Sequence, residues 1–590
     1  MSNVYLNRLF VIVLAAVVVA AGCSMRPSSD NPSTSINTPD SRARNAAKHE
    51  GAKLPQEKKA SPANAERIAT EVTAIPPVKG KTRDMRLSRL PASAGVVSSA
   101  EPHTLRMPSE PLDRETYAHF DDNPIKRVVE HPVSTFSIDV DTGAYANVRR
   151  LLRAGRLPVH DAVRIEELIN YFSYNYPAPD DSKRPFRVST VIAPAPWSAD
   201  RYLLHIGIKG YDITKEALPP ANLVFLVDVS GSMRASNKLE LLKTSLKLLA
   251  RQLRQQDRIA IVVYAGASSV VLEPVPGNAS GKIIAALDSL TAGGSTNGGA
   301  GIRLAYAMAE QAFVPDGINR VLLATDGDFN VGTVNFEALK NLIEEKRKTG
   351  ISLTTLGFGT GNYNDHLMEQ LADAGNGNYA YIDNLNEAQK VLVDELSSTM
   401  HTIAKDVKIQ IEFNPNVVAE YRLIGYENRA LKREDFDNDK VDAGEIGAGH
   451  TVTAIYEVVL QGSTAVRLEP LRYSAEKPSG TAHAEELAFL RIRYKLPDSN
   501  KSTLMEWALE SRDVLADIAQ SPDNFRFSAA VAAFAQILRG GKYTGEMSYD
   551  DVAALARNAR GQDRFGYRGE FIQLVNLAQS LAGTSKQASR

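Results

Sequence analysis

The sequence gathers small oxygen-bearing side chains at three places, two of them directly after apolar runs. The first place is D-V-S-G-S, which follows the apolar run 223–227, with a glycine between its serines that permits a tight turn. The other two are the glycine-rich stretch G-G-S-T-N-G-G-A-G and the stretch L-A-T-D-G-D. Hydroxyls and carboxylates without histidine or cysteine suit a hard divalent cation, and magnesium, which keeps several waters, needs few direct protein ligands. The candidate ligands are Asp228, Ser230, Ser232, Thr296 and Asp326.

The elements around these residues alternate between apolar strands and amphipathic helices. Strands are predicted at 223–227, 259–264, 269–275 (an edge strand), 321–324, 351–356 and 378–382. Helices are predicted at 239–253, 282–290, from the glycine-rich turn to 313, and at 336–348, 365–372 and 387–400. This alternation predicts a doubly wound parallel α/β sheet. Such folds bind ligands beyond the carboxyl ends of their strands, where the candidate ligands lie.

The three stretches, in this order, resemble the metal-ion-dependent adhesion site of von Willebrand factor type A (VWFA) domains. Thr296 follows Ser232 by 64 residues, and Asp326 follows Thr296 by 30. The resemblance implies that Ser230, Ser232 and Thr296 bind the metal directly, and that Asp228 and Asp326 act through waters or as hydrogen-bond acceptors around it. It also implies Mg²⁺, or Mn²⁺ or Ca²⁺, with a carboxylate from a partner protein completing the metal's shell. The alternative is a helix start capped by serines.

The first residues predict export and lipid attachment. One basic residue, Arg8, precedes an apolar run and then Gly22 and Cys23, the single cysteine of the chain. This is typical of a secretory signal peptide over 1–22. The small residues before Cys23 resemble the lipobox of bacterial lipoproteins, which implies acylation of Cys23 with chains such as palmitate. Ser24 after it then implies the outer membrane, facing the periplasm. An ordinary signal peptide with an incidental cysteine is the alternative.

A tether follows the cysteine. Residues 23–123 are rich in Ser, Ala, Pro and Lys with little periodicity, a composition that predicts a disordered segment. A random coil of about 100 residues has an r.m.s. reach of roughly 55 Å. Residues 24–110 hold 14 basic and 9 acidic residues while the whole chain has a net charge of −1, so the rest is mildly acidic. That charge gives no support to nucleic-acid binding.

The segments on either side of the central domain carry a second resemblance. F-S-I-D-V-D-T-G-A-Y-A-N-V-R-R, D-A-V-R-I-E-E-L-I-N-Y-F and Y-R-L-I-G-Y-E-N-R-A-L are similar to stretches of a bacterial lipoprotein family. Its members have a short N-terminal domain, a central VWFA domain and a C-terminal domain of no assigned chemistry. The resemblance implies a domain order of 124–219, VWFA at 220–402, a β-rich domain at 403–500 and a helical region at 501–590.

Strand alternation at 187–208 and 407–460, with a further strand at 487–494, predicts one β-sandwich into which the VWFA domain is inserted. Helices are predicted at 504–518, 527–538, 549–557 and 566–581. The fold class is therefore α/β: a doubly wound VWFA domain inserted in a β-sandwich-like domain, with a helical C-terminal region.

Several motifs resemble catalytic or binding sites only in part. D-V-D-T-G (139–143) matches the phosphatase pattern D-x-D-x-T except at its last residue, and 435–446 matches half of a calcium loop. The glycine-rich stretches at 293–301 and 357–362 lack the lysine and the third glycine that nucleotide-binding loops need. Five histidines are scattered without a motif: His131, His160, His366, His401 and His450.

The sequence therefore predicts a lipid-anchored, metal-dependent adhesion or scaffold module that is not an enzyme. The alternative is a hydrolase or phosphotransferase in the flanking domains, with Asp139 as its reactive group. A chaperone that works with a cytoplasmic ATPase, as some bacterial VWFA proteins do, conflicts with export. The sequence identifies neither the partner nor the oligomeric state.

Overall fold

The computed structural model describes residues 115–180, 184–327, 336–473 and 483–588. The predicted signal peptide, Cys23 and nearly all of the predicted tether lie outside the described residues. The described residues belong to one unit. None of the helices in the described ranges combines the length and the hydrophobicity that a transmembrane span requires.

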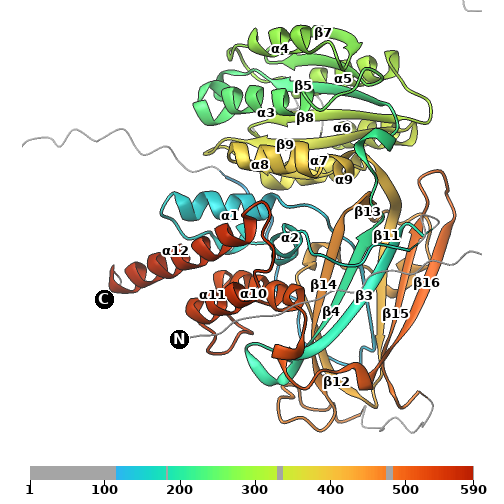
Figure 1. Cartoon of the computed structure of the whole chain (residues 1–590), viewed down its shortest axis with the longest axis vertical. Coiled ribbons are helices and arrows are strands. Elements are labelled where there is room, and N and C mark those ends of the chain that lie inside the picture. Colours follow the sequence, from blue (N-terminus) through green and yellow to red (C-terminus); the bar gives the residue numbers. More distant parts are fainter. Residues whose placement is uncertain (1–114, 181–183, 328–335, 474–482, 589–590) are drawn as a thin grey trace, which may run out of the picture. The chain divides into compact units, whose positions relative to one another are not determined.

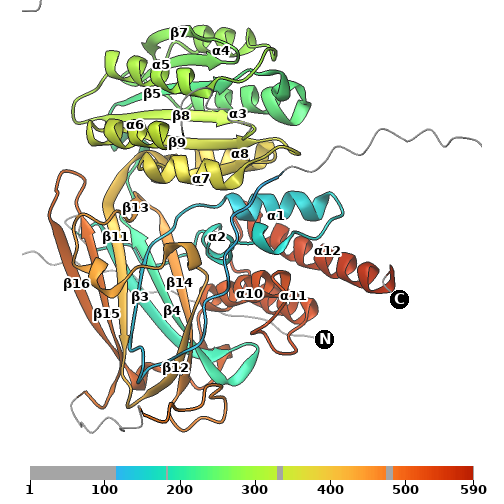
Figure 2. The ribbon, with the colours of Figure 1, turned by 180° about the vertical axis from the view of Figure 1, so that it is seen from behind.

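The central domain is built on a six-stranded sheet in the order β10-β9-β8-β5-β6-β7 (Figures 1 and 2). Its strands are β5 (Ala221–Asp228), β6 (Arg258–Tyr264), β7 (Ser268–Pro276), β8 (Ile318–Thr325), β9 (Ile351–Phe358) and β10 (Tyr379–Ile382). All neighbours run parallel except β7, which is antiparallel to β6 at the edge. Strand β5 is buried along its whole length because helices cover both faces of the sheet.

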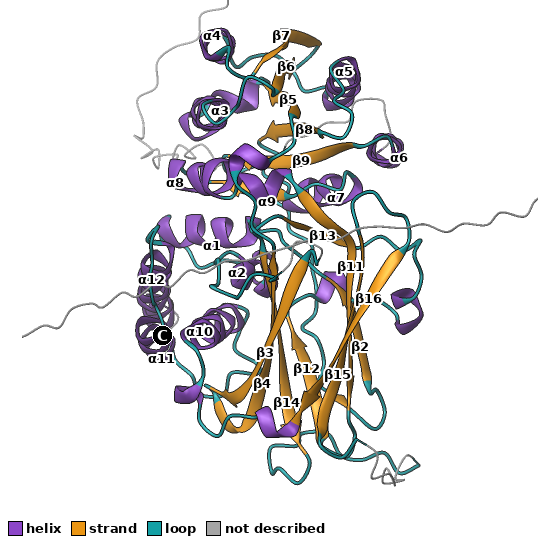
Figure 3. Cartoon of the chain, turned by 45° about the vertical axis from the view of Figure 1, so that its right-hand side comes forward, coloured by secondary structure: helices purple, strands orange, loops and turns teal. Residues whose placement is uncertain are grey.

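The helices of this domain divide between the two faces, as a doubly wound sheet requires (Figure 3). One face packs against α3 (Leu241–Ala250), α4 (Ser280–Asp288) and α8 (Leu385–Gln389). The other packs against α5 (Gly298–Gln311), α6 (Phe336–Lys348) and α7 (Asp365–Ala374). Leu242, Leu246 and Leu249 of α3 are fully buried, which confirms the helical spacing of leucines in the sequence.

Two antiparallel sheets form the sandwich. The first has the order β1-β12-β14-β4-β3, and the second β13-β11-β15-β16, with β2 also paired to β11. The first contains β1 (Lys126–Arg127), β3 (Phe186–Ala195), β4 (Ser198–Gly210), β12 (Val418–Ile424) and β14 (Thr451–Leu460). The second group contains β2 (Val133–Ser137), β11 (Thr402–Phe413), β13 (Gly444–Gly447), β15 (Glu486–Lys495) and β16 (Ser502–Glu510). Their inner faces share one apolar core that includes Ile206, Tyr456, Ile409 and Leu490.

Each sheet contains strands from before and from after the central domain, and these pair with each other. Strand β4 pairs with β14, and β2 pairs with β11. The central domain is therefore inserted in the sandwich, as the sequence predicts.

Helices cover the outer face of the first sheet. They are α1 (Gly143–Arg153), α2 (Ile165–Asn170), α10 (Asp523–Leu538), α11 (Tyr549–Asn558) and α12 (Tyr567–Ala588). Buried alanines and phenylalanines of α10, among them Phe527 and Phe534, pack in the same core as Leu203 and Ile455 of the sheet. The C-terminal region is helical from α10 onward.

Two predicted elements differ from the structure. The helix predicted at 504–518 is wrong, because this segment begins as strand β16, which pairs with β15 at the edge of the second sheet. The single closing helix predicted at 387–400 is divided into α8, a π-helical segment (Lys390–Asp394) and α9 (Leu396–Met400).

Candidate functional site

Two neighbouring parallel strands place the two predicted carboxylates together. Asp228 is the last residue of β5, and Asp326 follows directly on β8. Both are fully buried. The Thr325 hydroxyl donates to Asp228 Oδ2 over 2.9 Å and so joins the two strand ends. Tyr264, which ends β6, donates to the same oxygen over 3.2 Å.

Asp228 in turn shapes the loop that carries the serines. Its Oδ1 accepts the backbone N–H of Ser230 over 2.8 Å. Burial raises the pKa of Asp228 to about 6, while hydrogen bonds from Ser230 oppose this rise. Both oxygens of Asp228 are thus occupied by donors of the protein, an arrangement that suits a residue acting around a metal instead of touching it.

The serine hydroxyls meet above these carboxylates. Ser230 Oγ and Ser232 Oγ are 2.9 Å apart, with Ser230 buried and Ser232 partly exposed. The glycine-rich loop is held beside them by two backbone hydrogen bonds, from Gly231 N–H to Gly294 O (2.9 Å) and from Gly293 N–H to Val229 O (2.7 Å). Thr296, also partly exposed, lies two residues farther along this loop.

Two polar side chains that the sequence reasoning missed belong to the same cluster. Lys238 Nζ forms an ion pair with Asp326 Oδ2 over 2.8 Å and donates to Asn362 Oδ1 over 2.8 Å. Asn362 Nδ2 also contacts Asp326 Oδ2, at 3.3 Å. Asn362 ends the stretch G-F-G-T-G-N, just beyond the end of β9, and β9 is the strand next to β8. Its position after a predicted strand could have indicated from the sequence that it belongs to the site.

The donor set fits a small hard dication. The predicted ligands are all oxygens, and the two hydroxyls at 2.9 Å already converge toward a common point. The buried Asp228 carries its charge just beneath them. Lys238 neutralises part of the charge of Asp326, so the cluster is less acidic than its two carboxylates alone suggest.

The phosphatase-like motif has a structural role instead. Asp139 binds Arg429 Nε over 3.1 Å, and Asp141 Oδ1 accepts the backbone N–H of Tyr379 in β10 over 2.8 Å. At Gly143 a Cβ atom would lie 2.3 Å from the Tyr379 ring, so only glycine permits this approach. Asp139 thus joins the two flanking segments to each other, and Asp141 joins the first of them to the central domain, which gives no support to Asp139 as a reactive group.

The three family-like stretches meet at this junction. Arg149, from the first stretch, binds Asp383, Glu387 and Glu570. Arg164, from the second, binds Glu167 within the same stretch and two α7 carboxylates, Asp365 (2.9 Å) and Glu369 (2.6 Å). Arg429, from the third, binds Asp139, Asp141, Glu369 and Asp373. The arginines therefore link the segments on both sides of the central domain to the domain itself.

The half-matched calcium loop is also tied down by ion pairs. Asp437 binds Arg493 of β15 over 2.5 Å, and Asp442 binds Arg347 of α6 over 2.7 Å. These carboxylates serve as partners of arginines, which favours the interpretation of this loop as a solvated acidic turn.

Comparisons with known proteins agree with this architecture. A family model described as von Willebrand factor type A domain matches residues 222–394, and one described as von Willebrand factor matches 111–205. The model of the C-terminal part of the uncharacterized protein YfbK matches 398–581.

Individual relatives cover different shares of the chain. It is 48% identical over 477 residues to the uncharacterized protein YfbK of Escherichia coli strain K12, covering 80% of this chain and 82% of that protein. It is 28% identical over 197 residues to the uncharacterized protein sll0103 of Synechocystis, covering 33% of this chain and 45% of that one. Among solved structures, a von Willebrand factor type A protein from Catenulispora acidiphila matches 67% of this chain and 91% of its own, with 16% identity and a TM-score of 0.37.

The matched domain limits the class of function. VWFA domains are generally adhesion or scaffold modules that bind proteins, and many bind a divalent metal. The central domain is therefore of a protein-binding type.

Proposed function

Because the chain belongs to the family of bacterial VWFA proteins that carry the YfbK C-terminal domain, we propose that it is a metal-dependent protein-binding module held on the cell envelope by a lipid anchor. The observation that carries this proposal is the pair of serine hydroxyls 2.9 Å apart above the buried Asp228, beside the loop of Thr296.

The metal would be Mg²⁺, or Mn²⁺ or Ca²⁺, and neutral ligands would keep it electrophilic. Ser230, Ser232 and Thr296 would hold it, with Asp228 and Asp326 accepting hydrogen bonds from its waters. When bound, the metal supplies a position for one carboxylate oxygen of a partner protein. Since Ser232 and Thr296 are partly exposed, a side chain of a partner has access to this edge of the sheet.

The anchor is the second part of the proposal. Acyl chains on Cys23 would hold the chain at the outer membrane on its periplasmic side, with each buried CH₂ contributing about 0.8 kcal/mol. The segment 24–114 would then separate the binding domain from the lipid surface.

Calorimetry on the full chain tests the site. We expect Ser232→Ala and Thr296→Ala to abolish Mg²⁺ binding and to leave the circular dichroism spectrum unchanged, since both side chains are partly exposed. Ser236→Ala, which changes an exposed serine a few residues beyond the loop, should bind Mg²⁺ as the wild type does. Unchanged Mg²⁺ binding in both site variants would rule out the site.

A capture experiment tests the binding function. Full chain immobilised through its C-terminus should retain a periplasmic protein in Mg²⁺ and release it in chelator, and Thr296→Ala should retain none. Retention that is equal with and without chelator would contradict the role of the metal in binding.

A further inference from the structure

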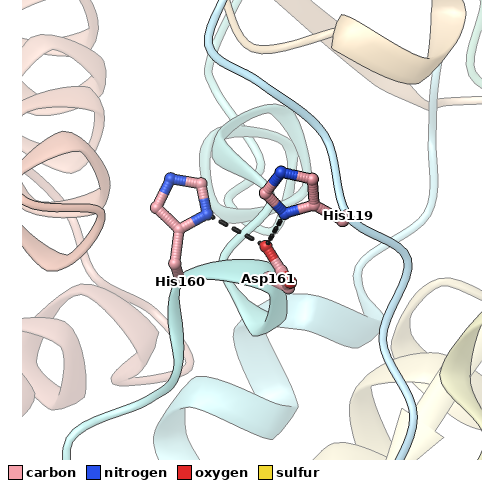
Figure 4. Close-up of side chains that lie close together, drawn as sticks. All are labelled: His119, His160 and Asp161. Atoms are coloured by element: carbon pink, nitrogen blue, oxygen red, sulfur yellow. Dashed lines mark hydrogen bonds and ion pairs between the residues drawn. The ribbon is translucent and has the colours of Figure 1, made fainter.

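Two histidines without a sequence motif meet in the structure. His119 lies in the extended segment 115–123, and His160 opens a 3₁₀ turn (His160–Ala162) that also carries Asp161 (Figure 4). His119 Nδ1 is 2.7 Å from Asp161 Oδ1, and His160 Nδ1 is 3.1 Å from the same oxygen. Figure 4 shows both rings turning a nitrogen toward Asp161.

We propose that His119, His160 and Asp161 bind a transition-metal dication, Zn²⁺ being the one whose preferences they match. One ligand atom from each residue lies within 4.8 Å of the other two. Zinc takes imidazole nitrogen at about 2.0–2.1 Å and carboxylate oxygen at about 2.0–2.2 Å in a tetrahedron, which separates neighbouring ligand atoms by about 3.3 Å. The present separations of 2.7 and 3.1 Å would open by about 0.6 and 0.2 Å, and the two histidine nitrogens, which lie within 4.8 Å of each other, would move to a similar spacing.

The chemistry of this cluster differs from that of the strand-end site. Imidazole suits zinc, copper and nickel, whereas the oxygen donors of Ser230 and Ser232 suit magnesium. Three protein ligands leave a fourth position of the zinc tetrahedron to water. The two sites should therefore be filled independently, and excess Mg²⁺ should occupy the strand-end site without competing for the histidines.

The charges around the cluster permit a cation. Asp121 Oδ1 lies 3.7 Å from His119 Nε2, on the side of the ring away from Asp161, and adds a second negative charge beside the cluster. Arg539, a cation whose charge reaches His119, is paired with Asp122 at 2.8 Å and Glu427 at 3.2 Å. The His119 side chain is 66% exposed and that of His160 40%, so a metal can enter from solvent.

Binding would close a long loop of the chain. His119 and Asp161 are 42 residues apart, and helix α1 lies between them. A metal held by all three side chains would fasten the segment 115–123 to the 3₁₀ turn. The one hydrogen bond of this cluster that does this now, between His119 and Asp161, is exposed to water and therefore weak.

A Zn²⁺ titration of the full chain, freed of metal and kept in excess Mg²⁺, tests the proposal. A chromophoric chelator measures the affinity, and Co²⁺ substitution reports nitrogen ligands by its visible absorption. We expect His119→Ala and His160→Ala each to weaken Zn²⁺ binding at this site at least about 100-fold, because each removes one of the two nitrogen ligands. His131→Ala, which removes another exposed histidine, should leave the affinity unchanged.

Hydrogen exchange gives a second measurement at the same residues. Zn²⁺ should slow amide exchange in 115–123 of the wild type and not in His160→Ala. Zn²⁺ affinity that is unaffected by both histidine substitutions would overturn the proposal, and so would exchange in 115–123 that is equal with and without Zn²⁺. Neither result would bear on Mg²⁺ binding at the strand ends, so the two proposals fail separately.

Discussion

At the scale of single residues, Lys238 places a positive charge where a cation is proposed to bind. Its side chain crosses Gly359 so closely that a Cβ atom there would lie 2.3 Å from Lys238 Cγ, and its ammonium ends on Asp326. A fixed ammonium beside a metal site repels the metal. The repulsion is weakly screened here, because the side chains of Lys238 and Asp326 are largely shielded from solvent. Lys238 therefore opposes the metal while it holds Asp326 in place.

The first prediction concerns this charge. Lys238→Met keeps the length of the stem and removes the ammonium, so we expect Mg²⁺ affinity to rise about fivefold or more by calorimetry. Lys243→Met is the control, because Lys243 binds Glu240 and the Leu290 carbonyl and not Asp326. A fall in affinity would mean that Lys238 matters chiefly for positioning Asp326.

The second prediction is a pH dependence that arises at Glu166. Burial raises the pKa of Glu166 from 4.5 to about 7, and the carboxylates of Glu427 and Asp139 add to the rise, against the N–H of Tyr426. A raised folded-state pKa means that this group's contribution to stability is fully present below pH 4.5 and is lost as the pH rises toward 7.

Glu166→Gln removes this titration and keeps the hydrogen-bond acceptor for Tyr426. We expect the variant to be more stable than the wild type by about 1–3 kcal/mol at pH 8 and nearly equal to it at pH 5, by urea unfolding. Glu434→Gln, at an exposed position, should show no such difference. An equal gain at both pH values would assign the effect to packing instead.

At the scale of elements, buried arginines join the central domain to its neighbours. Arg149 of α1 is 1% exposed and binds Asp383 and Glu387, at and near the start of α8, and Glu570 of α12. The side chain also lies over the ring of Tyr171. One residue therefore connects three helices that are far apart in the chain.

The third prediction tests this connection. Arg149→Ala leaves Asp383 and Glu387 buried without their cation, so we expect the free energy of unfolding to fall by about 3–5 kcal/mol. Arg153→Ala, which removes a half-exposed partner of the same Glu570, should cost less than about 1 kcal/mol. Chemical denaturation measures both, and equal losses would contradict a special role for the buried pair.

Element by element, the sequence predicts the central domain better than the sandwich. In the central domain, the apolar residues are continuous in the strands and recur every three or four residues in the helices. This pattern predicts β5, β8 and α3 where they form. Strand β16 was missed because S-T-L-M-E-W-A-L-E is rich in helix-forming residues. Pairing with β15 overrides that preference, and only the folded sheet shows it.

The same contrast holds for the sites. The strand-end cluster was legible because its residues stand in ordered stretches at predicted strand ends. The sequence did not reveal Lys238, Asn362 or the pair His119 and His160, because each meets its partners only through the tertiary fold. For Lys238 and Asn362 the partners are 36 to 124 residues away along the chain.

At the scale of the whole molecule, the fourth prediction concerns the anchor. Cys23→Ala removes the thiol to which acyl chains would attach, so we expect the chain to move from the outer-membrane fraction to the soluble periplasmic fraction or to remain uncleaved. Mass spectrometry of the wild type should find acyl chains on Cys23. An unmodified cysteine would contradict the anchor, and recovery in the inner membrane would contradict only the role of Ser24.

The insertion of one domain in another also sets an order of events during folding. Thr135 and Gln410 are hydrogen-bonded neighbours although 275 residues separate them. Strand β2 can therefore pair only when β11 is present. The central domain is continuous in the chain, so its sheet can form without the flanking segments. Its two ends, Pro219 and Met400, line the same small cavity.

Once the central domain has folded, it holds the ends of the sandwich segments close together. The loop that must close when β4 pairs with β14 is then short instead of long and flexible, which lowers the entropic cost of pairing. Until then, strand β2 and the edge of β4 that will pair with β14 are open to aggregation. We therefore expect the domain proposed to bind a partner to fold first and to serve as the scaffold on which the sandwich strands pair.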